Sequence, residues 1–456
     1  MPNSKLKQTG LVLVGVVTGI MLSLNFPANA NRLGPQQPLP VEDMRAFAEV
    51  FSVVKRDYVE PVEDKKLITQ AISGMLSGLD PHSAYLDADA LKELQDGIQG
   101  EFGGLGLEVG MEDGFVKVVS PIEDSPAFRA GIKAGDLIVK IDDTLAKGMP
   151  IDEAVKRMRG KPLTKITLTL ARRGESKPIV VTLTREVIKV QSVKSKTVEP
   201  GYGYLRVAQF QENTVRSVVE HLGKLGKDGK PRGLILDLRG DPGGLLNSAI
   251  GVTAAFIPEG ATVVSTRGRT PGAQREYRAT PNDYVLGSSG DFLRALPLWA
   301  REVPMVVLVN GGSASASEIV AGALQDHKRA TIMGTRTFGK GSVQTTLPLS
   351  NNAAIKLTTA RYYTPAGRSI QAKGIDPDIV VEESAEGGSV KRLRETDLQR
   401  HLGNDLDPDA ENKARTDPAK PAAAPLKPFE LGGQNDYQLS QALNKLKGLQ
   451  VAESKP

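Results

Sequence analysis

The sequence predicts a layered α/β core that carries an inserted β-rich domain and has helical segments at both ends. Two short apolar runs, 233–238 and 305–309, are typical of buried strands, and helical stretches follow them at 245–257 and 317–324. Such alternation of strands and helices favours an α/β layer fold. Between residues 100 and 187 the pattern changes to short strands separated by Gly and Asp turns, which predicts a separate β-domain.

The first thirty residues are typical of an export signal. Lys5 and Lys7 precede an apolar run from Leu11 to Leu24, and Ala28-Asn29-Ala30 fits an A-x-A cleavage site. We therefore expect residues 1–30 to be a cleavable signal and the mature protein to act in the periplasm. The alternative is an uncleaved anchor that keeps the protein at the membrane, although the apolar run is short for a bilayer span.

Composition excludes several classes of function. The 456 residues contain no cysteine, so disulfides, thiol catalysis and a lipid anchor on a cysteine are excluded. The net charge is only +5, without a basic patch that contains aromatic residues, which argues against nucleic acid as a partner. No spacing of histidines and carboxylates suggests a ligand set, so we expect no metal and no cofactor.

Residues 31–95 predict an N-terminal helical segment. Apolar residues recur at helical spacing between 41 and 58, and a second helical stretch covers 65–79. The turn residues Gly78 to Ser83 then end that stretch. These helices are too small to form a core of their own, so we expect them to pack on the body of the protein or on another subunit.

The β-domain, residues 96–187, begins with a glycine-rich loop, Gly104-Leu105-Gly106-Leu107, and contains the turn 130–136, Ala-Gly-Ile-Lys-Ala-Gly-Asp. This order of loop, turn and strands resembles a PDZ domain of the bacterial protease type. Consecutive backbone amides in such a loop can hold a terminal carboxylate, and the adjacent strand edge can pair with an extended peptide. The alternative is a glycine-rich turn in an ordinary β-domain.

The run Ser313 to Glu318 and the segment around Lys340 point to acyl chemistry. A serine hydroxyl needs a base to become a nucleophile, and a desolvated lysine amine can act as one. Taken alone, Ser315-x-x-Glu318 also fits a helix capping box. Gly334-x-x-x-x-Gly339-Lys340 imitates a phosphate-binding loop, but Gly341 stands where Ser or Thr is needed, so we expect no nucleotide.

Five motifs in order resemble the carboxyl-terminal processing peptidases, which are tail-specific serine proteases. They are the β-domain and the segments 79–86, 237–244, 313–318 and 338–344. The resemblance covers residues 41 to 381 and implies a crotonase-like layered α/β protease core over 188–384. One departure is Asp241, where the family pattern has Asn before Pro-Gly-Gly.

The resemblance implies Ser315 as nucleophile, Lys340 as general base and Gln344 as the residue that orients the lysine. A serine at a helix start lies at the positive end of the helix dipole, and the amide of Ala316 then points to where an oxyanion forms. The second donor is carried over as Gly244, with Gly243 as the neighbouring candidate. Gln344 lies four residues beyond Lys340, about 6 Å away on a helical turn but roughly 13 Å away on a strand. The orienting role therefore predicts a turn there.

The four histidines are the rival bases. His327 lies twelve residues after Ser315, about 18 Å along a helix axis. His82 lies in a turn, His221 on a polar helix and His401 in the C-terminal tail. We therefore expect the lysine, and not a histidine, to act as base.

The sequence thus predicts an exported serine endopeptidase that captures C-terminal tails of partly unfolded envelope proteins in its PDZ domain and cleaves them with a serine–lysine pair. The family further implies a homo-oligomer, gating by the PDZ domain and an envelope adaptor or lipoprotein as partner. Residues 385–456 are predicted to be a polar linker, most marked at 417–428, followed by a helix at 436–449. The alternatives are a catalytically silent PDZ scaffold or chaperone and a hydrolase of small esters.

Overall fold

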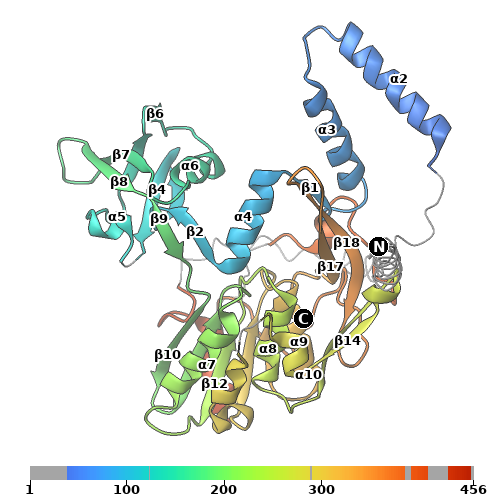
Figure 1. Ribbon diagram of the computed structural model, residues 1–456. Helices are drawn as coiled ribbons and strands as arrows, with labels where there is room; N and C mark the ends of the chain where they lie inside the picture. The colour runs from blue at the N-terminus through green and yellow to red at the C-terminus, as the bar shows by residue number, and fades with distance from the viewer. Residues whose placement is uncertain (1–38, 123, 288–289, 386–391, 409–429, 453–456) are drawn as a thin grey trace, which may run out of the picture. The chain divides into compact units, whose positions relative to one another are not determined.

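The computed structural model of the chain describes residues 39–452, apart from 123, 288–289, 386–391 and 409–429 (Figure 1). The predicted signal segment and most of the predicted polar linker lie outside the described residues. Of the helices within the described part, none is long and apolar enough to cross a membrane.

A six-stranded sheet forms the centre of the core. Its strands follow the order β10-β11-β12-β15-β16-β19, and all neighbours pair in parallel except β10 with β11. The two runs predicted as buried strands are the central β12 and β15, in which every residue is buried. The bounds are β10 Val193–Glu199, β11 Tyr202–Val207, β12 Gly233–Asp237, β15 Met305–Val309, β16 Thr331–Gly334 and β19 Ile379–Val380.

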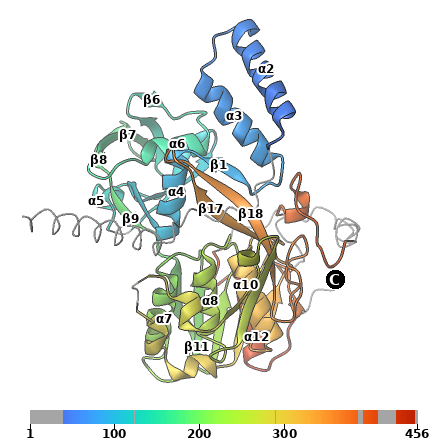
Figure 2. The same cartoon turned by 45° about the vertical axis from the view of Figure 1, so that its right-hand side comes forward.

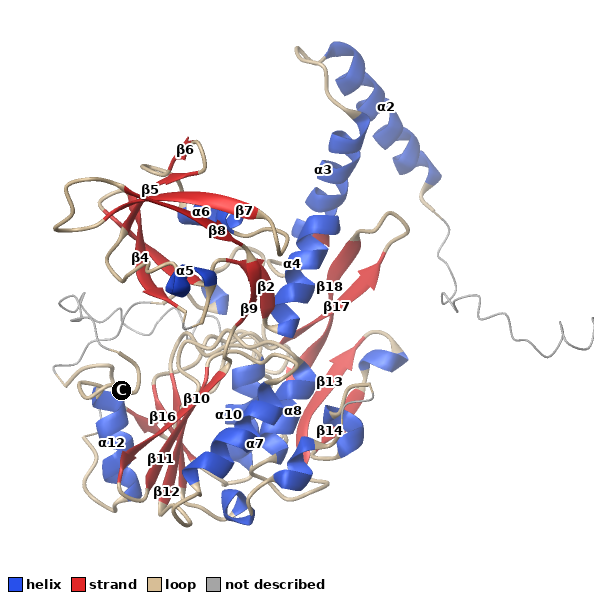
Figure 3. Cartoon of the chain, turned by 60° about the vertical axis from the view of Figure 1, so that its left-hand side comes forward, coloured by secondary structure: helices blue, strands red, loops and turns tan. Residues whose placement is uncertain are grey.

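Helices cover both faces of this sheet, as Figure 3 shows. Because side chains alternate along a strand, Leu234 and Leu236 join one apolar cluster, whereas Ile235 joins the cluster on the opposite face. The first cluster contains side chains of α7 (Thr214–Leu225), α8 (Leu246–Ala254) and α10 (Ala316–Asp326). The second contains α12 (Tyr437–Leu446), the predicted terminal helix, which therefore belongs to the core.

A second sheet carries the lysine segment. Its strands follow the order β1-β18-β13-β14, and β17 pairs with β18 as the antiparallel hairpin that follows Lys340. Strand β1 comes from the N-terminal turn motif and pairs with β18, so that motif is fixed beside the hairpin. The bounds are β1 Ala84–Leu86, β13 Thr262–Gly268, β14 Arg275–Arg278, β17 Ser342–Pro348 and β18 Ala354–Tyr363.

The predicted β-domain has an apolar core of its own, built from residues such as Val116, Ile138 and Leu168. Its sheet follows the order β3-β4-β5-β7-β8, with β6 beside β5, and a separate ribbon pairs β2 with β9. The bounds are β2 Glu101–Gly104, β3 Leu107–Glu112, β4 Phe115–Pro121, α5 Pro126–Arg129, β5 Leu137–Ile141, β6 Thr144–Leu145, α6 Ile151–Met158, β7 Lys165–Ala171, β8 Ile179–Thr184 and β9 Glu186–Lys189.

The helices predicted near the N-terminus are present as α2 (Val41–Asp57) and α3 (Asp64–Ser77), followed by α4 (Ala88–Gln99) (Figure 2). Helix α2 buries none of its residues. The remaining short helices are η1 Pro271–Ala273, α9 Pro281–Tyr284, η2 Phe292–Ala295, η3 Leu298–Arg301 and η4 Glu395–Asp397.

Two parts of the predicted polar tail are packed on the core. Glu395 and Asn404 are buried, and Asn404 donates to the main-chain oxygen of Gln371 at 2.8 Å. Helix α12 is held by Arg239, whose guanidinium is fully buried between the carboxylates of Asp237 and Asp436, each 2.6 Å away. Residues far apart in the sequence therefore complete the core that carries the site.

Candidate active site

Ser315 is held in a strained conformation at the start of α10. Its φ of +54° and ψ of −109° lie outside the regions that non-glycine residues ordinarily adopt. The preceding turn fixes it, since Ser313 Oγ donates to Leu238 O at 2.7 Å and the Ala314 amide donates to Asp241 O at 2.9 Å. Strain that the surroundings impose is typical of a functional position.

Glu318 connects the serine segment to the lysine segment. One carboxylate oxygen accepts the amides of Ser315 at 2.8 Å and of Lys340 at 2.9 Å. The other accepts the Gly339 amide at 2.7 Å and the Thr337 hydroxyl at 2.6 Å. Glu318 thus accepts the Ser315 amide, as the capping box Ser315-x-x-Glu318 requires, and the same carboxylate also fixes the chain at both proposed reacting residues.

Burial raises the pKa of the Glu318 carboxyl to about 7, although the hydrogen bonds that it accepts act in the opposite direction. The sequence alone predicts Glu318 only as part of a helix cap. Its contacts with residues 337 to 340 leave no signal in sequence spacing, because they depend on how α10 packs beside the segment that precedes β17.

Lys340 lies between β16 and β17 with its side chain partly buried. Burial lowers the pKa of its amine below the ordinary value, and the positive charge of Lys356 on β18 lowers it further. Glu395, Glu318 and Asp80 act in the opposite direction. Among the hydrogen bonds and ion pairs of the described residues, none uses the Lys340 amine, whereas its main-chain N–H is bound by Glu318. The amine is therefore positioned by its backbone and is not neutralised by a bound carboxylate.

The glycine turn after β12 lies against the serine. A Cβ on Gly243 would lie 2.9 Å from both Ser315 Cβ and Ala316 N, so only glycine allows this approach. The Gly243 amide donates to Asp241 Oδ1 at 2.8 Å. In contrast, the amides of Gly244 and Ala316 donate to no group within the described part of the chain. These are the two N–H groups predicted as oxyanion donors: Ala316 follows Ser315 directly, and Gly244 follows the Gly243 that lies against Ser315.

Gln344 has a geometry that differs from both alternatives weighed for it. It lies on β17, neither in a helical turn nor on a straight strand, because a bulge occurs between Val343 and Gln344. Its amide nitrogen donates to Ser342 Oγ at 2.9 Å and to Thr358 Oγ1 at 3.5 Å. No hydrogen bond to Lys340 is present, so the orienting role stays a prediction.

A series of hydrogen bonds between polar side chains connects the lysine segment to Gln371, Glu395 and His82. The Gly341 amide donates to Gln371 Oε1 at 2.9 Å, and Gln371 Nε2 donates to Glu395 Oε1 at 3.0 Å. The other side of Glu395 faces His82, whose Nε2 lies 2.9 Å from Oε2. His82 in the turn motif and Glu395 in the tail are thus in contact, and Gln371 links them to the main chain next to Lys340. Sequence reasoning missed this role for Glu395.

The histidines are engaged elsewhere. His327 lies at the far end of α10, where its ring contacts Thr262 O at 2.7 Å. His221 contacts Ser195 Oγ at 2.7 Å, and His401 contacts Leu398 O at 2.8 Å. With His82 bound to Glu395, none of the four rings has a hydrogen bond to Ser315, and the geometry gives no support to a histidine base.

The predicted peptide-binding loop borders a small cavity of about 60 Å³ in the β-domain. Gly106 has a φ of +74°, and a Cβ there would lie 2.2 Å from Ser125 Cβ, so the loop shape depends on glycine. The cavity lies between the loop and α6, and its lining is mainly apolar: Phe102, Gly104, Leu105, Gly106, Leu107, Val109, Val155, Met158 and Arg159. A cavity with this lining suits an apolar side chain.

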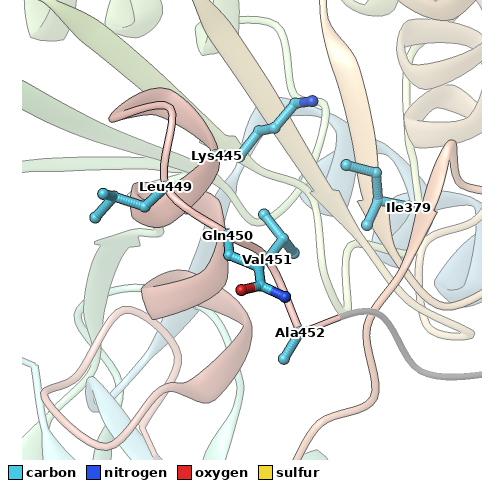
Figure 4. A pocket seen from close by; sticks show the side chains of 6 residues that line it. All are labelled: Ile379, Lys445, Leu449, Gln450, Val451 and Ala452. Atoms are coloured by element: carbon cyan, nitrogen blue, oxygen red, sulfur yellow. The ribbon is translucent and has the colours of Figure 1, made fainter.

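A larger hollow of about 620 Å³ lies beside β19 and the end of α12 (Figure 4). It is lined by Ile379, Lys445, Leu449, Gln450, Val451 and Ala452, none of which is a predicted site residue. Across the described residues, no group of three or more His, Cys, Asp or Glu side chains could hold a metal ion.

Comparisons with known proteins identify three segments. Residues 201–381 match peptidase family S41, residues 117–172 match a PDZ domain, and residues 23–90 match the N-terminal domain described for the activating protease CtpB.

Two relatives in sequence agree with these matches over most of their length. A carboxy-terminal-processing protease of Bartonella bacilliformis is 45% identical over 95% of each chain. The carboxy-terminal processing protease CtpA of Bacillus subtilis is 35% identical over 83% of this chain and 78% of its own. The solved structure of a photosystem II D1 C-terminal processing protease is 31% identical, covers 75% of this chain and 93% of its own, and has a TM-score of 0.44.

Proposed function

Since the chain belongs to peptidase family S41 and is a carboxy-terminal processing serine protease with a PDZ domain, we propose that it cleaves with a serine–lysine pair formed by Ser315 and Lys340. The unpaired, partly buried Lys340 amine carries this proposal. Because the pKa of this amine is lowered and no carboxylate is bound to it, the neutral form is reached at a lower pH than for an exposed lysine, and only the neutral form accepts a proton.

In this mechanism the Lys340 amine takes the proton of the Ser315 hydroxyl as Oγ attacks the scissile carbonyl carbon. Negative charge then develops on the carbonyl oxygen, and the Gly244 and Ala316 amides stabilise it. The ammonium next gives its proton to the leaving amine as the C–N bond breaks, which leaves an acyl-enzyme. Water, deprotonated by the same amine, hydrolyses the ester and regenerates Ser315.

The catalytic assignment is tested by Ser315→Ala and Lys340→Ala, assayed on a disordered protein such as casein. We expect both variants to stay folded, each with a cooperative melting transition, and to lose cleavage. Full activity of Lys340→Ala would exclude the lysine as base, and full activity of both variants would exclude this site. Inactive wild-type enzyme that still binds the substrate would favour the scaffold alternative.

We further propose that the PDZ domain captures the free C-terminus of its substrate. The apolar cavity beside the Gly104–Leu107 loop supports this role, since it suits an apolar terminal residue. Matched peptides that end in a free or an amidated carboxyl group provide the test. We expect the amidated peptide to bind the PDZ domain at least about tenfold more weakly, because it lacks the negative carboxylate to which the loop amides donate. Equal binding would contradict tail capture.

Export to the periplasm and self-assembly are proposed on separate grounds. The signal-like residues 1–30 support export, and N-terminal sequencing of the exported protein tests cleavage after Ala30. Helix α2 leaves Val41, Met44, Phe47 and Val50 exposed, which supports contact with another subunit or an adaptor. Light scattering on the chain that begins at residue 31 and on a variant that lacks residues 31–60 tests assembly, and the same number of subunits per particle in both would contradict a role of α2 in it.

A further inference from the structure

Asp241 is a buried carboxyl group that the catalytic mechanism does not use. It lies in the turn between β12 and α8 and is fully buried. Its Oδ1 accepts the Gly243 amide at 2.8 Å, whereas Oδ2 has no hydrogen-bond partner. Its main-chain oxygen accepts the Ala314 amide at 2.9 Å and the Ser317 hydroxyl at 3.0 Å. Asp241 therefore contacts both the glycine turn and the serine segment.

The charged groups on neighbouring elements do not neutralise Asp241. The guanidinium of Arg239 is already paired with the carboxylates of Asp237 and Asp436. Arg206 on β11 favours the ionised form of Asp241, but its Nη1 lies 3.7 Å from Asp237 and donates to the main-chain oxygen of Arg239.

On α10, the carboxylate of Glu318 is bound to the serine and lysine segments. Burial raises the pKa of Asp241 to about 8, which agrees with a carboxyl that lacks a counter-ion.

We propose that Asp241 is a positioning residue that works in its protonated, neutral form to hold the Gly243 turn against Ser315, and that loss of its proton limits catalysis on the alkaline side. The inference rests on the proposed function, because this turn carries the Gly244 amide assigned to the oxyanion.

The physical reason is repulsion between two negative charges in a buried site: the ionised Asp241 carboxylate and the oxyanion of the tetrahedral intermediate. Ionised Asp241 places an unpaired negative charge two residues from Gly243, beside the position where the tetrahedral intermediate becomes negative. An unpaired buried charge also favours movement of the turn toward water, which would separate Gly243 from Ser315. Both effects weaken oxyanion stabilisation, and neither operates while the carboxyl is neutral.

The test is the pH dependence of kcat/KM for casein cleavage by the wild type and by Asp241→Asn, a neutral side chain of the same shape. We expect wild-type kcat/KM to fall about tenfold per pH unit above about pH 8. In Asp241→Asn this alkaline fall should be absent, while the rise at lower pH, which Lys340 controls, should remain. Asp228→Asn, an exposed residue with the same change in charge, is the matched control and should keep the wild-type profile.

Melting temperatures provide a second measurement. The pKa of Asp241 is raised from 3.8 to about 8, so the folded state holds the proton more tightly and wild-type stability falls as pH rises between these values. The melting temperature of Asp241→Asn relative to wild type should therefore increase across this window and then level off. Asp241→Ser, a smaller neutral side chain, should show the same trend and the same lack of an alkaline fall.

An alkaline fall that persists in a folded Asp241→Asn enzyme would overturn the inference, as would a folded Asp241→Asn enzyme that is inactive at every pH. These failures are distinct from failure of the proposed function. If Ser315→Ala or Lys340→Ala stays active, the catalytic pair is wrong whatever the profile of Asp241→Asn. If both are inactive and the alkaline fall persists, only the role of Asp241 is wrong.

Discussion

Glu318 binds the main-chain N–H of Lys340 at 2.9 Å through the same carboxylate oxygen that accepts the N–H of Ser315. A single fully buried side chain therefore sets the spacing between the proposed nucleophile and the proposed base. Because reacting groups must be held within a fraction of an ångström, a residue that touches neither reacting atom can still control the rate.

Replacing Glu318 by Gln should reduce kcat by about 100-fold or more, because an amide cannot accept four donors and one of its own N–H groups would face a backbone N–H. The serine and lysine segments would then separate. We would measure kcat and KM on casein together with the melting curve. Glu302→Gln on the surface is the control. A kcat within a few-fold of the wild type, in a folded variant, would contradict the role of Glu318.

Replacing Lys340 by Met should abolish cleavage and stabilise the fold at neutral pH. The pKa of Lys340 is lowered in the folded state, so below its ordinary value of 10.5 the unfolded chain holds the proton more tightly than the folded protein does. The wild type therefore gains stability as pH rises from the folded pKa toward 10.5. The advantage of the Met variant in melting temperature should be largest near pH 7 and should shrink across that window.

Lys227→Met, which removes an exposed lysine, is the control for this measurement and should show no pH-dependent gain. A Lys340→Met variant that melts at or below the wild-type temperature at pH 7 would mean that the amine is not disfavoured by burial.

Replacing Asp436 by Ala should destabilise the core by about 3–5 kcal/mol, because it leaves the fully buried Arg239 guanidinium without one of its two carboxylates. Calorimetry should show an earlier transition of the core. The transition of the β-domain, which has a separate apolar core, should not change. Ser440→Ala on the exposed side of α12 is the control, and an equal effect of both substitutions would exclude Arg239 as the cause.

Replacing Gly106 by Ala should weaken peptide binding while the catalytic core stays folded. The residue has a φ of +74°, and the added methyl group would meet Ser125 Cβ at 2.2 Å, so the loop must move. We expect a higher KM for tailed substrates with little change in kcat. Gly114→Ala has a similar φ of +77° but open space around it, so it separates backbone strain from displacement of the loop. Equal KM changes in the two variants would contradict a specific role of the loop.

Much of the fold and part of the site could be predicted from the sequence. The buried strands β12 and β15 are short apolar runs, and helix α10 follows its serines directly, so local patterns place Ser315 at a helix start. The glycine turn and Lys340 also lie in segments whose own residues define them. Gln344 was harder to place, because its relation to Lys340 depends on a bulge, and a bulge is set by pairing with β18 and not by spacing along β17.

The sequence by itself determined which chemical groups are present and which local structure carries each one, since helix starts, glycine turns and buried strands depend on neighbouring residues. The tertiary structure alone decided which groups meet. Glu318 binds the main chain of both Ser315 and Lys340. Glu395 contacts His82 and, through Gln371, is linked to the lysine segment. Asp436 supplies the second carboxylate that binds Arg239. These contacts join residues up to hundreds of positions apart, and their formation depends on how buried polar groups find partners when the layers pack, which no local pattern records.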